Sequence, residues 1–137
     1  MARMTPDLAK KSLGLQKDGK LSPCPDLPNC VCSQYPQDAK HAIEGLPFSG
    51  DASAAKQRLK ELCSSLKGAK LADEKGLYLR VEFTSSFFKF VDDVEFLFDD
   101  KAKIVHFRSA SRLGQWDIGA NRKRMESIRK AFALAAG

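Results

Sequence analysis

Hydrophobic residues recur along the chain with two different periods, and the longer period predicts two helices. Apolar side chains spaced by three and four residues indicate an amphipathic helix over 52–67, which Gly68 terminates. The same spacing indicates a last helix over 120–134, where Asn121 is a polar residue on the apolar stripe. Cys63 lies at the edge of the first stripe, so we expect it to be a buried structural residue.

The shorter period, an alternation of apolar and polar residues, predicts half-buried strands. Three such strands are expected, at residues 78–83, 93–98 and 104–108. A connection of hairpin length, residues 99–102, joins the second strand to the third, so these two should pair antiparallel. We place a fourth, edge strand at Leu71 and Ala72. The simplest assembly is an α+β domain, with both helices on one face of an antiparallel sheet of three or more strands.

The first third of the chain lacks either period. Residues 1–20 are therefore expected to be a flexible lead-in. Five prolines between residues 21 and 48 exclude long helices and central strands, which predicts a peripheral segment rich in proline and cysteine. A chain of 137 residues supports one hydrophobic core, so a single domain is expected over 21–137.

Composition and charge narrow the class of protein. An apolar fraction of 43% with 29% charged residues is typical of a soluble globular protein. The net charge of +6 favours acidic partners, but the basic segments lack interleaved aromatic residues, which disfavours nucleic acid. No stretch has the roughly 20 apolar residues of a transmembrane helix. As written the chain is expected in the cytoplasm; removal of an export segment would place it in the periplasm or on a lipoprotein anchor, so localisation stays open.

Three cysteines form a cluster with the spacing C-x5-C-x-C, at Cys24, Cys30 and Cys32. Zinc sites usually combine two closely spaced pairs of ligands, whereas here only His41 and His106 are available as further soft ligands outside the cysteines. A disulfide or free thiols are therefore favoured over a metal, and no cofactor is expected.

The predicted strands place a set of charged residues on the sheet face away from the helices. These residues are Arg80, Glu82, Asp93, Glu95, His106 and Arg108. Cross-strand ion pairs on a solvated face are the favoured interpretation, and a ligand-binding face is the alternative. His106, Glu95 or Asp93 could act as acid or base in an enzyme, but the chain contains no recognisable catalytic motif. Whether the protein is an enzyme stays open.

Three phenylalanines crowd the segment between the first two predicted strands, residues 84–91. Strand alternation cannot bury all of them on one face. We favour a loop that folds under the sheet edge and plugs the core, over an apolar contact site for a lipid, a partner or a bilayer surface.

Polar residues also gather where the last strand leads into the last helix. The candidates for ligand binding are Ser109, Ser111, Arg112, Asp117, Asn121 and Arg124. Arginine side chains and the N–H groups at a helix start both suit anions, so this loop is a candidate anion site. The side chain of Arg112 decides between the alternatives. If internal carboxylates engage it, the cluster is structural; if it points into an open concavity with Arg124, the anion site is favoured.

Several blocks of the sequence together resemble the domain-of-unknown-function family numbered 1499. They are Cys24-Pro-Asp-Leu-Pro-Asn-Cys30-Val, His41-Ala-Ile, Leu46-Pro47-Phe48, Phe90-Val-Asp-Asp-Val-Glu-Phe96, Arg108-Ser-Ala-Ser-Arg112 and Asp117-Ile-Gly-Ala-Asn121-Arg-Lys-Arg124. The resemblance implies a small bacterial or plastid protein, in a family where many members follow an export signal or a lipoprotein anchor and no activity is agreed. Where the family usually has serine, this chain has Cys32.

These observations favour a non-catalytic binding or accessory module, with an anion-binding polar cluster at the strand-to-helix loop. Its partner is expected to be a small anionic ligand or another protein. One alternative is a cryptic enzyme that acts on a small anionic substrate with Arg112 as the anion clamp. The other is a metal or redox element built from the clustered cysteines.

Overall fold

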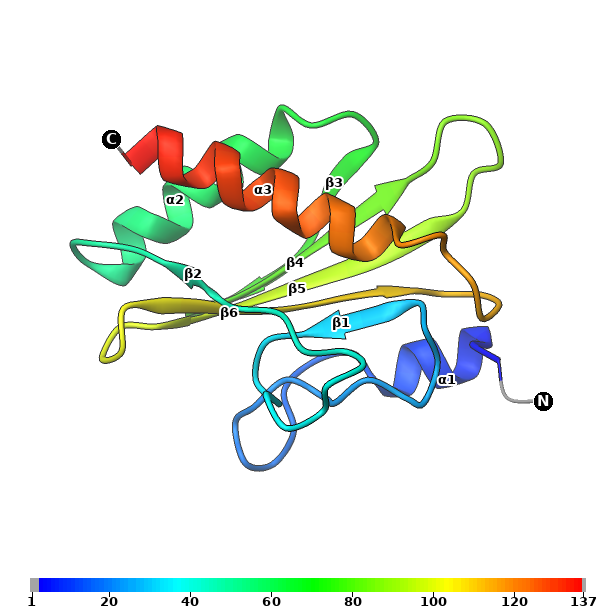
Figure 1. The fold of residues 1–137 in the computed structure, drawn as a ribbon. Coiled ribbons are helices and arrows are strands. Elements are labelled where there is room, and N and C mark those ends of the chain that lie inside the picture. The colour runs from blue at the N-terminus through cyan, green and yellow to red at the C-terminus, as the bar shows by residue number, and fades with distance from the viewer. Residues whose placement is uncertain (1–2, 137) are drawn as a thin grey trace.

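A computed structural model describes residues 3–136 and shows a six-stranded antiparallel sheet at the centre of the protein (Figure 1). The strands are β1 (Cys30–Cys32), β2 (Leu46–Pro47), β3 (Ala69–Lys75), β4 (Tyr78–Thr84), β5 (Val91–Asp99) and β6 (Ile104–Ser111). Their order across the sheet is β1-β6-β5-β4-β3, and β2 pairs with the same edge of β6 as β1 does. The α+β class and the antiparallel sheet are confirmed.

The strands form where the sequence alternates. In the pairing of β5 with β6, Phe96 lies opposite Phe107, and their side chains share the apolar face. β3 is longer than the edge strand expected at Leu71 and Ala72. β1 was not predicted, because all its residues are buried and it shows no alternation.

Two long helices, α2 (Ala52–Ser64) and α3 (Ala120–Ala136), lie above the same side of the sheet in Figure 1. Asp51 caps α2, and its carboxylate accepts the Ala54 N–H at 2.8 Å. The chain then turns into β3 at Gly68, where φ is +79° and a Cβ would lie 2.3 Å from the carbonyl oxygen of Thr84. Only glycine fits this turn, so it fixes the passage from helix to sheet.

One continuous core joins these helices to the sheet. Its members include Leu59, Cys63, Leu79, Val81, Val94, Phe96, Phe107, Met125, Ile128 and Phe132. Both predicted helical stripes therefore contribute to the same apolar cluster as the inward residues of the strands. Cys63 is buried in this cluster, as the helical spacing indicated.

The opposite face of the sheet is covered by the N-terminal part of the chain (Figure 1). The short helix α1 (Pro6–Lys11) contributes Ala9 to an apolar cluster with Cys30. Further along, the buried side chain of Leu21 packs against Tyr78 of β4. The residues described within the predicted lead-in thus make contacts with the sheet. None of the helices in the described part of the chain has the length and apolar character needed to cross a bilayer.

Candidate functional site

We call the sheet face opposite α2 and α3 the closed face, because α1 and the segment that leads from it to β1 lie over it. Four of its residues form one ion-pair cluster. Arg80 Nη1 lies 3.0 Å from both Glu82 and Asp93, while Arg112 donates from Nε to Asp93 at 2.8 Å and from Nη2 to Glu82 at 2.8 Å. Each carboxylate is shared by two guanidinium groups. The charges of this cluster are therefore satisfied within the protein.

A second charged pair on the closed face is deeply buried. The side chain of Glu95 is 0% exposed and that of Arg108 is 1% exposed. Glu95 Oε2 accepts hydrogen bonds from the Tyr78 hydroxyl and, at 2.7 Å, from the Gly14 N–H. Arg108 Nη1 lies 3.7 Å from Glu95 Oε1, too far for a direct hydrogen bond, and Arg108 Nε and Nη2 have no protein acceptor. The two opposite charges attract each other but form no direct hydrogen bond.

Burial dominates the ionisation of this pair. It raises the pKa of Glu95 and lowers the pKa of Arg108, so loss of hydration outweighs the attraction between them. The expectation of a solvated face is therefore wrong for Asp93, Glu95 and Arg108, which are all buried. The strand registers place the six charged residues on one face, but alternation carries no information about what covers that face.

His106 lies near the other end of the closed face. Its Nδ1 is 3.2 Å from the Ser33 hydroxyl oxygen. Burial lowers the pKa of His106, which favours the neutral ring. Neither the pocket beside the start of α3 nor a smaller one between α2 and β3 is lined by His106, Glu95 or Asp93. None of the three acid-base candidates thus lines either cavity.

The polar cluster at the strand-to-helix loop is centred on the buried side chain of Asn121. Asn121 Oδ1 accepts a hydrogen bond from the Ser109 hydroxyl at 2.6 Å. Its Nδ2 donates to the Ser111 hydroxyl at 3.0 Å, to Asp117 Oδ2 at 2.8 Å and to the Asn29 carbonyl at 3.1 Å. The amide therefore ties β6, the following loop and the residue before β1 to the first turn of α3.

The two arginines of the predicted cluster lie on different sides of the sheet. Arg124 joins the cluster: it donates to Asn121 Oδ1 at 3.1 Å and to Asp92 at 2.7 Å, and it lies over the ring of Phe83. Arg112 does not join it, because its guanidinium binds carboxylates of the closed face. By the criterion set from the sequence, the engagement of Arg112 favours a structural role over an anion clamp.

A pocket of about 580 Å³ opens beside this cluster. Its polar lining residues include Asp92, Ser111, Arg112, Asp117 and Arg124. Its apolar lining residues include Met4, Phe90, Leu113 and Trp116. Residues 3–6 form one wall, held in place because the Gly114 N–H donates to the Met4 carbonyl at 2.9 Å. Sequence reasoning missed this wall, since nothing local links it to the loop before α3.

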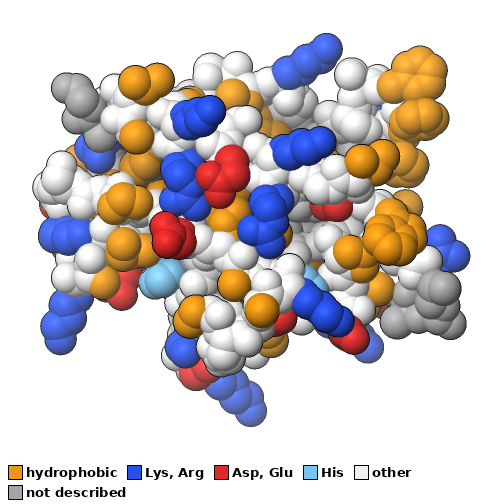
Figure 2. Space-filling view, in the orientation of Figure 1, with side chains coloured by type: hydrophobic (Ala, Val, Ile, Leu, Met, Phe, Trp, Pro, Cys, Tyr) orange, Lys and Arg blue, Asp and Glu red, His pale blue; other side chains and the backbone are white. Residues whose placement is uncertain are grey.

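Six exposed apolar side chains lie in the two loops that contribute to this pocket, the β4–β5 loop and the loop before α3, and we call them the apolar rim. They are Phe87, Phe88, Phe90, Leu113, Trp116 and Ile118. Figure 2 shows hydrophobic side chains gathered at the end of the molecule where the β4–β5 loop and the loop before α3 lie. Phe87 is 84% exposed and Trp116 is 76% exposed. The interpretation of the aromatic segment as a plug of the core is therefore wrong, because its rings point outward.

The cysteines are divided between a disulfide and two buried thiols. Cys24 and Cys30 are bonded to each other, while Cys32 and Cys63 are free and buried. Burial raises the pKa of Cys32, and it raises that of Cys63 to about 12. Both thiols are thus held in their unreactive form. Among the described residues, no group of three or more histidine, cysteine and acidic side chains is placed to hold a metal ion.

Comparison with known proteins agrees with the blocks of sequence that resemble a family. The family described as "Protein of unknown function (DUF1499)" matches residues 20–132, which include the sheet, α2 and most of α3. No curated protein and no solved structure gives a match to this chain. Since the matched range covers most of its length, the chain belongs to the DUF1499 family.

Proposed function

We propose that the protein is a non-catalytic binding module whose pocket takes a small amphipathic molecule. The observation that carries this proposal is the mixed lining of the pocket beside α3, which combines apolar and polar side chains. Phe90, Leu113 and Trp116 contribute apolar surface to the lining, and Ser111 and Arg124 contribute polar groups. Ligand sites of this kind combine a mostly apolar lining with a few placed polar groups.

The polar groups of the pocket support binding over catalysis. Among the described residues that line it, none is a histidine, cysteine or lysine. Asp117 is occupied by the amide of Asn121 and by the Gly119 N–H at 2.8 Å. Arg124 is paired with Asp92. Among the described lining residues, no hydroxyl group is therefore paired with a histidine or lysine base, the arrangement that activates a serine or threonine nucleophile.

An anion without an apolar part is the weaker ligand class. Arg112 and Arg124 both border the pocket, but each already faces a carboxylate at 2.7–2.8 Å. A phosphate or carboxylate group would have to share these guanidinium groups with Asp93 and Asp92. Apolar burial is therefore the larger source of affinity that the pocket offers.

The fluorescence of Trp116 tests the proposal, because it is the single tryptophan and stands at the pocket mouth. Decanol and decanoate are titrated below their micellar concentrations, with inorganic phosphate as a third probe. We expect both amphipaths to shift the emission to shorter wavelength and to raise the melting temperature, with phosphate inactive. A response to phosphate alone would favour the anion site, and no response to either amphipath would contradict the proposal.

Two variants localise the response. Leu113→Ser removes part of the apolar lining and is expected to weaken decanol binding about tenfold. Leu134→Ser is the matched control, since Leu134 is also exposed but lies near the far end of α3. Equal affinity in the two variants would show that the amphipath binds elsewhere.

A further inference from the structure

Most of the large apolar side chains that are exposed lie together in the apolar rim and are not scattered over the surface. The described residues include ten large apolar side chains that are exposed, and six of these lie in the two loops that contribute to the pocket. Single exposed apolar residues are ordinary, whereas several of them concentrated in two loops at one end of the molecule mark a contact surface. Neither loop needs these side chains to form the core, since the main core cluster contains none of them.

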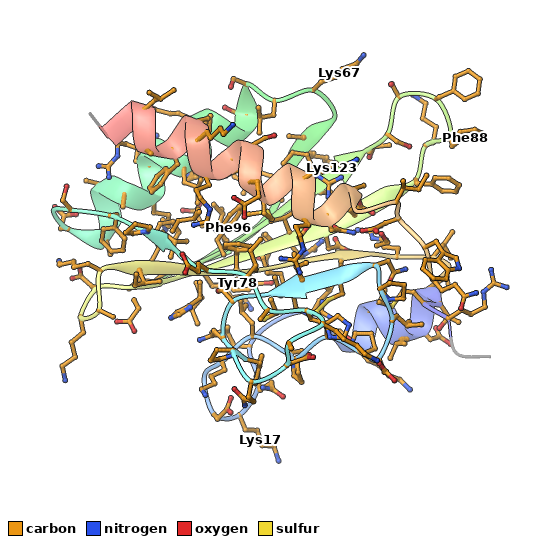
Figure 3. The ribbon with its side chains drawn as sticks, in the orientation of Figure 1. Lys17, Lys67, Tyr78, Phe88, Phe96 and Lys123 are labelled. Atoms are coloured by element: carbon orange, nitrogen blue, oxygen red, sulfur yellow. A yellow bond between two sulfur atoms is a disulfide. The ribbon has the colours of Figure 1, made fainter. Side chains whose placement is uncertain are left out.

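The loop between β4 and β5 presents its aromatic residues in a fixed arrangement. Phe87 and Phe88 meet edge to face with ring centroids 4.9 Å apart, and Phe88 stacks on Phe90 at 5.6 Å. The base of the loop is closed by the Ser85 N–H, which donates to the Phe90 carbonyl at 2.8 Å. Figure 3 shows Phe88 at the outer end of this loop. The rings contact one another and solvent, which is the opposite of what burial would favour.

The second loop holds an apolar residue outward against its backbone preference. Ile118 has a φ of +56° and is 89% exposed. A β-branched residue is strongly disfavoured in the left-handed region. Since Ile118 is outside the core clusters, packing does not account for this conformation. Strain of this kind concentrates at functional sites.

Basic residues accompany the apolar rim. Lys89 stands between Phe88 and Phe90, and the loop from Ser85 to Phe90 contains no carboxylate. Arg3 lines the pocket wall, and Lys123 lies on the first turn of α3 (Figure 3). The chain as a whole carries a charge of +6. Aromatic rings at loop tips with lysine and arginine beside them match the boundary between lipid headgroups and acyl chains.

We propose that the apolar rim docks the protein onto an anionic bilayer surface, with the pocket mouth turned toward the lipid. The occupant is a bilayer and not a groove of a partner, because the apolar residues stand on two loop tips separated by an opening. A bilayer accommodates separate protruding side chains, whereas a protein interface needs a continuous, complementary patch. This inference goes beyond the proposed ligand binding and does not depend on it.

Vesicle co-sedimentation tests the docking directly. The full chain is mixed with vesicles of phosphatidylcholine alone, and with vesicles that also contain phosphatidylglycerol. We expect binding to the anionic vesicles that weakens as salt is raised, and weak binding to the neutral ones. Absence of binding to the anionic vesicles at low salt would overturn the proposal.

Variants of the rim separate docking from folding and from ligand binding. The double change Phe87→Ser with Phe88→Ser should lower vesicle affinity more than tenfold, because two exposed rings lose their lipid contacts. Leu134→Ser, matched in exposure, should bind as the wild type does. Lys89→Gln should weaken binding to anionic vesicles only. Equal vesicle binding by wild type and the double variant would contradict docking through the rim.

Two further measurements give separate outcomes. The double variant keeps Trp116 and Leu113, so its decanol titration should match that of the wild type; a pocket that fails to bind decanol leaves the docking result unaffected. Size-exclusion chromatography detects self-association. A wild-type dimer that the double variant loses, without vesicle binding, would assign the rim to a second copy of the chain and overturn bilayer docking.

Discussion

The closed face and the apolar rim both depart from the usual rule that charged side chains are exposed and apolar side chains are buried. On the closed face, Glu95 and Arg108 are charged residues taken out of water. At the pocket end, Phe87 and Ile118 are apolar residues left in water. Hydrogen bonds to Glu95 and the packing around both side chains hold the first arrangement, whereas nothing in the core explains the second. The contrast separates residues that the fold requires from residues that are available for contact with another molecule.

The largest expected effect comes from breaking the buried pair on the closed face. Arg108→Met leaves the Glu95 carboxylate buried without its cation, and we expect a loss of about 3–5 kcal/mol in the free energy of unfolding. Urea unfolding measures this loss. The double change Arg108→Met with Glu95→Gln removes both charges and should recover much of it. A double variant as unstable as the single one would show that packing, and not charge, is the cause.

A smaller effect is expected from the disulfide that holds the cover of the closed face. Cys24 and Cys30 are six residues apart, so replacing both with serine should cost about 2 kcal/mol through the added freedom of the unfolded chain. Hydrogen exchange at the Gly14 N–H, which binds Glu95, should also become faster. Unchanged stability under oxidising conditions would show that packing alone holds the cover.

The stability of the closed face should also depend on pH through His106. Its pKa in the folded protein lies below the ordinary value of 6.5, so the neutral ring stabilises the fold above that pH. This contribution is lost as the pH falls below 6.5, since protonation favours the unfolded chain. Comparison of urea midpoints for wild type and His106→Gln across this range isolates the effect. Parallel pH profiles would contradict it.

The smallest effects are expected at the pocket end, where stability and binding should separate. Phe88→Ser and Trp116→Ser remove exposed side chains, so each should change the free energy of unfolding by less than about 0.5 kcal/mol. Thermal unfolding measures this. A loss of stability as large as that from truncating a core residue would show that the apolar rim supports the fold, and would contradict the distinction between the rim and the closed face.

The hydrophobic pattern of the sequence predicted those helices and strands that bury one side against the core. The alternation in β4, β5 and β6 and the stripes of α2 and α3 depend only on which side of one element faces the core. The buried amide of Asn121 was also found in this way, because a polar residue on an apolar stripe needs hydrogen-bond partners.

The remainder depends on contacts between distant segments. The sequence grouped Arg112 with the loop before α3. In the structure β6 pairs with β5 as far as Ser111, so the strand alternation continues to Arg112. The side chain of Arg112 therefore points to the closed face, where it shares carboxylates with Arg80. The cover of the closed face and the wall formed by residues 3–6 come from a stretch without periodicity. Sequence period describes one element at a time and cannot place one segment over another.

The bridge between Met4 and Gly114 has a consequence for how the shape of the pocket varies among relatives. It attaches residues 3–6 to the pocket, although the family match spans only residues 20–132. One wall of the cavity is therefore contributed from outside the shared region. A relative with the same sheet, helices and Asn121 cluster but a different segment at this place would enclose a differently shaped cavity. Exchange of this segment between two members would therefore change the shape of the cavity while the sheet and the helices stay the same.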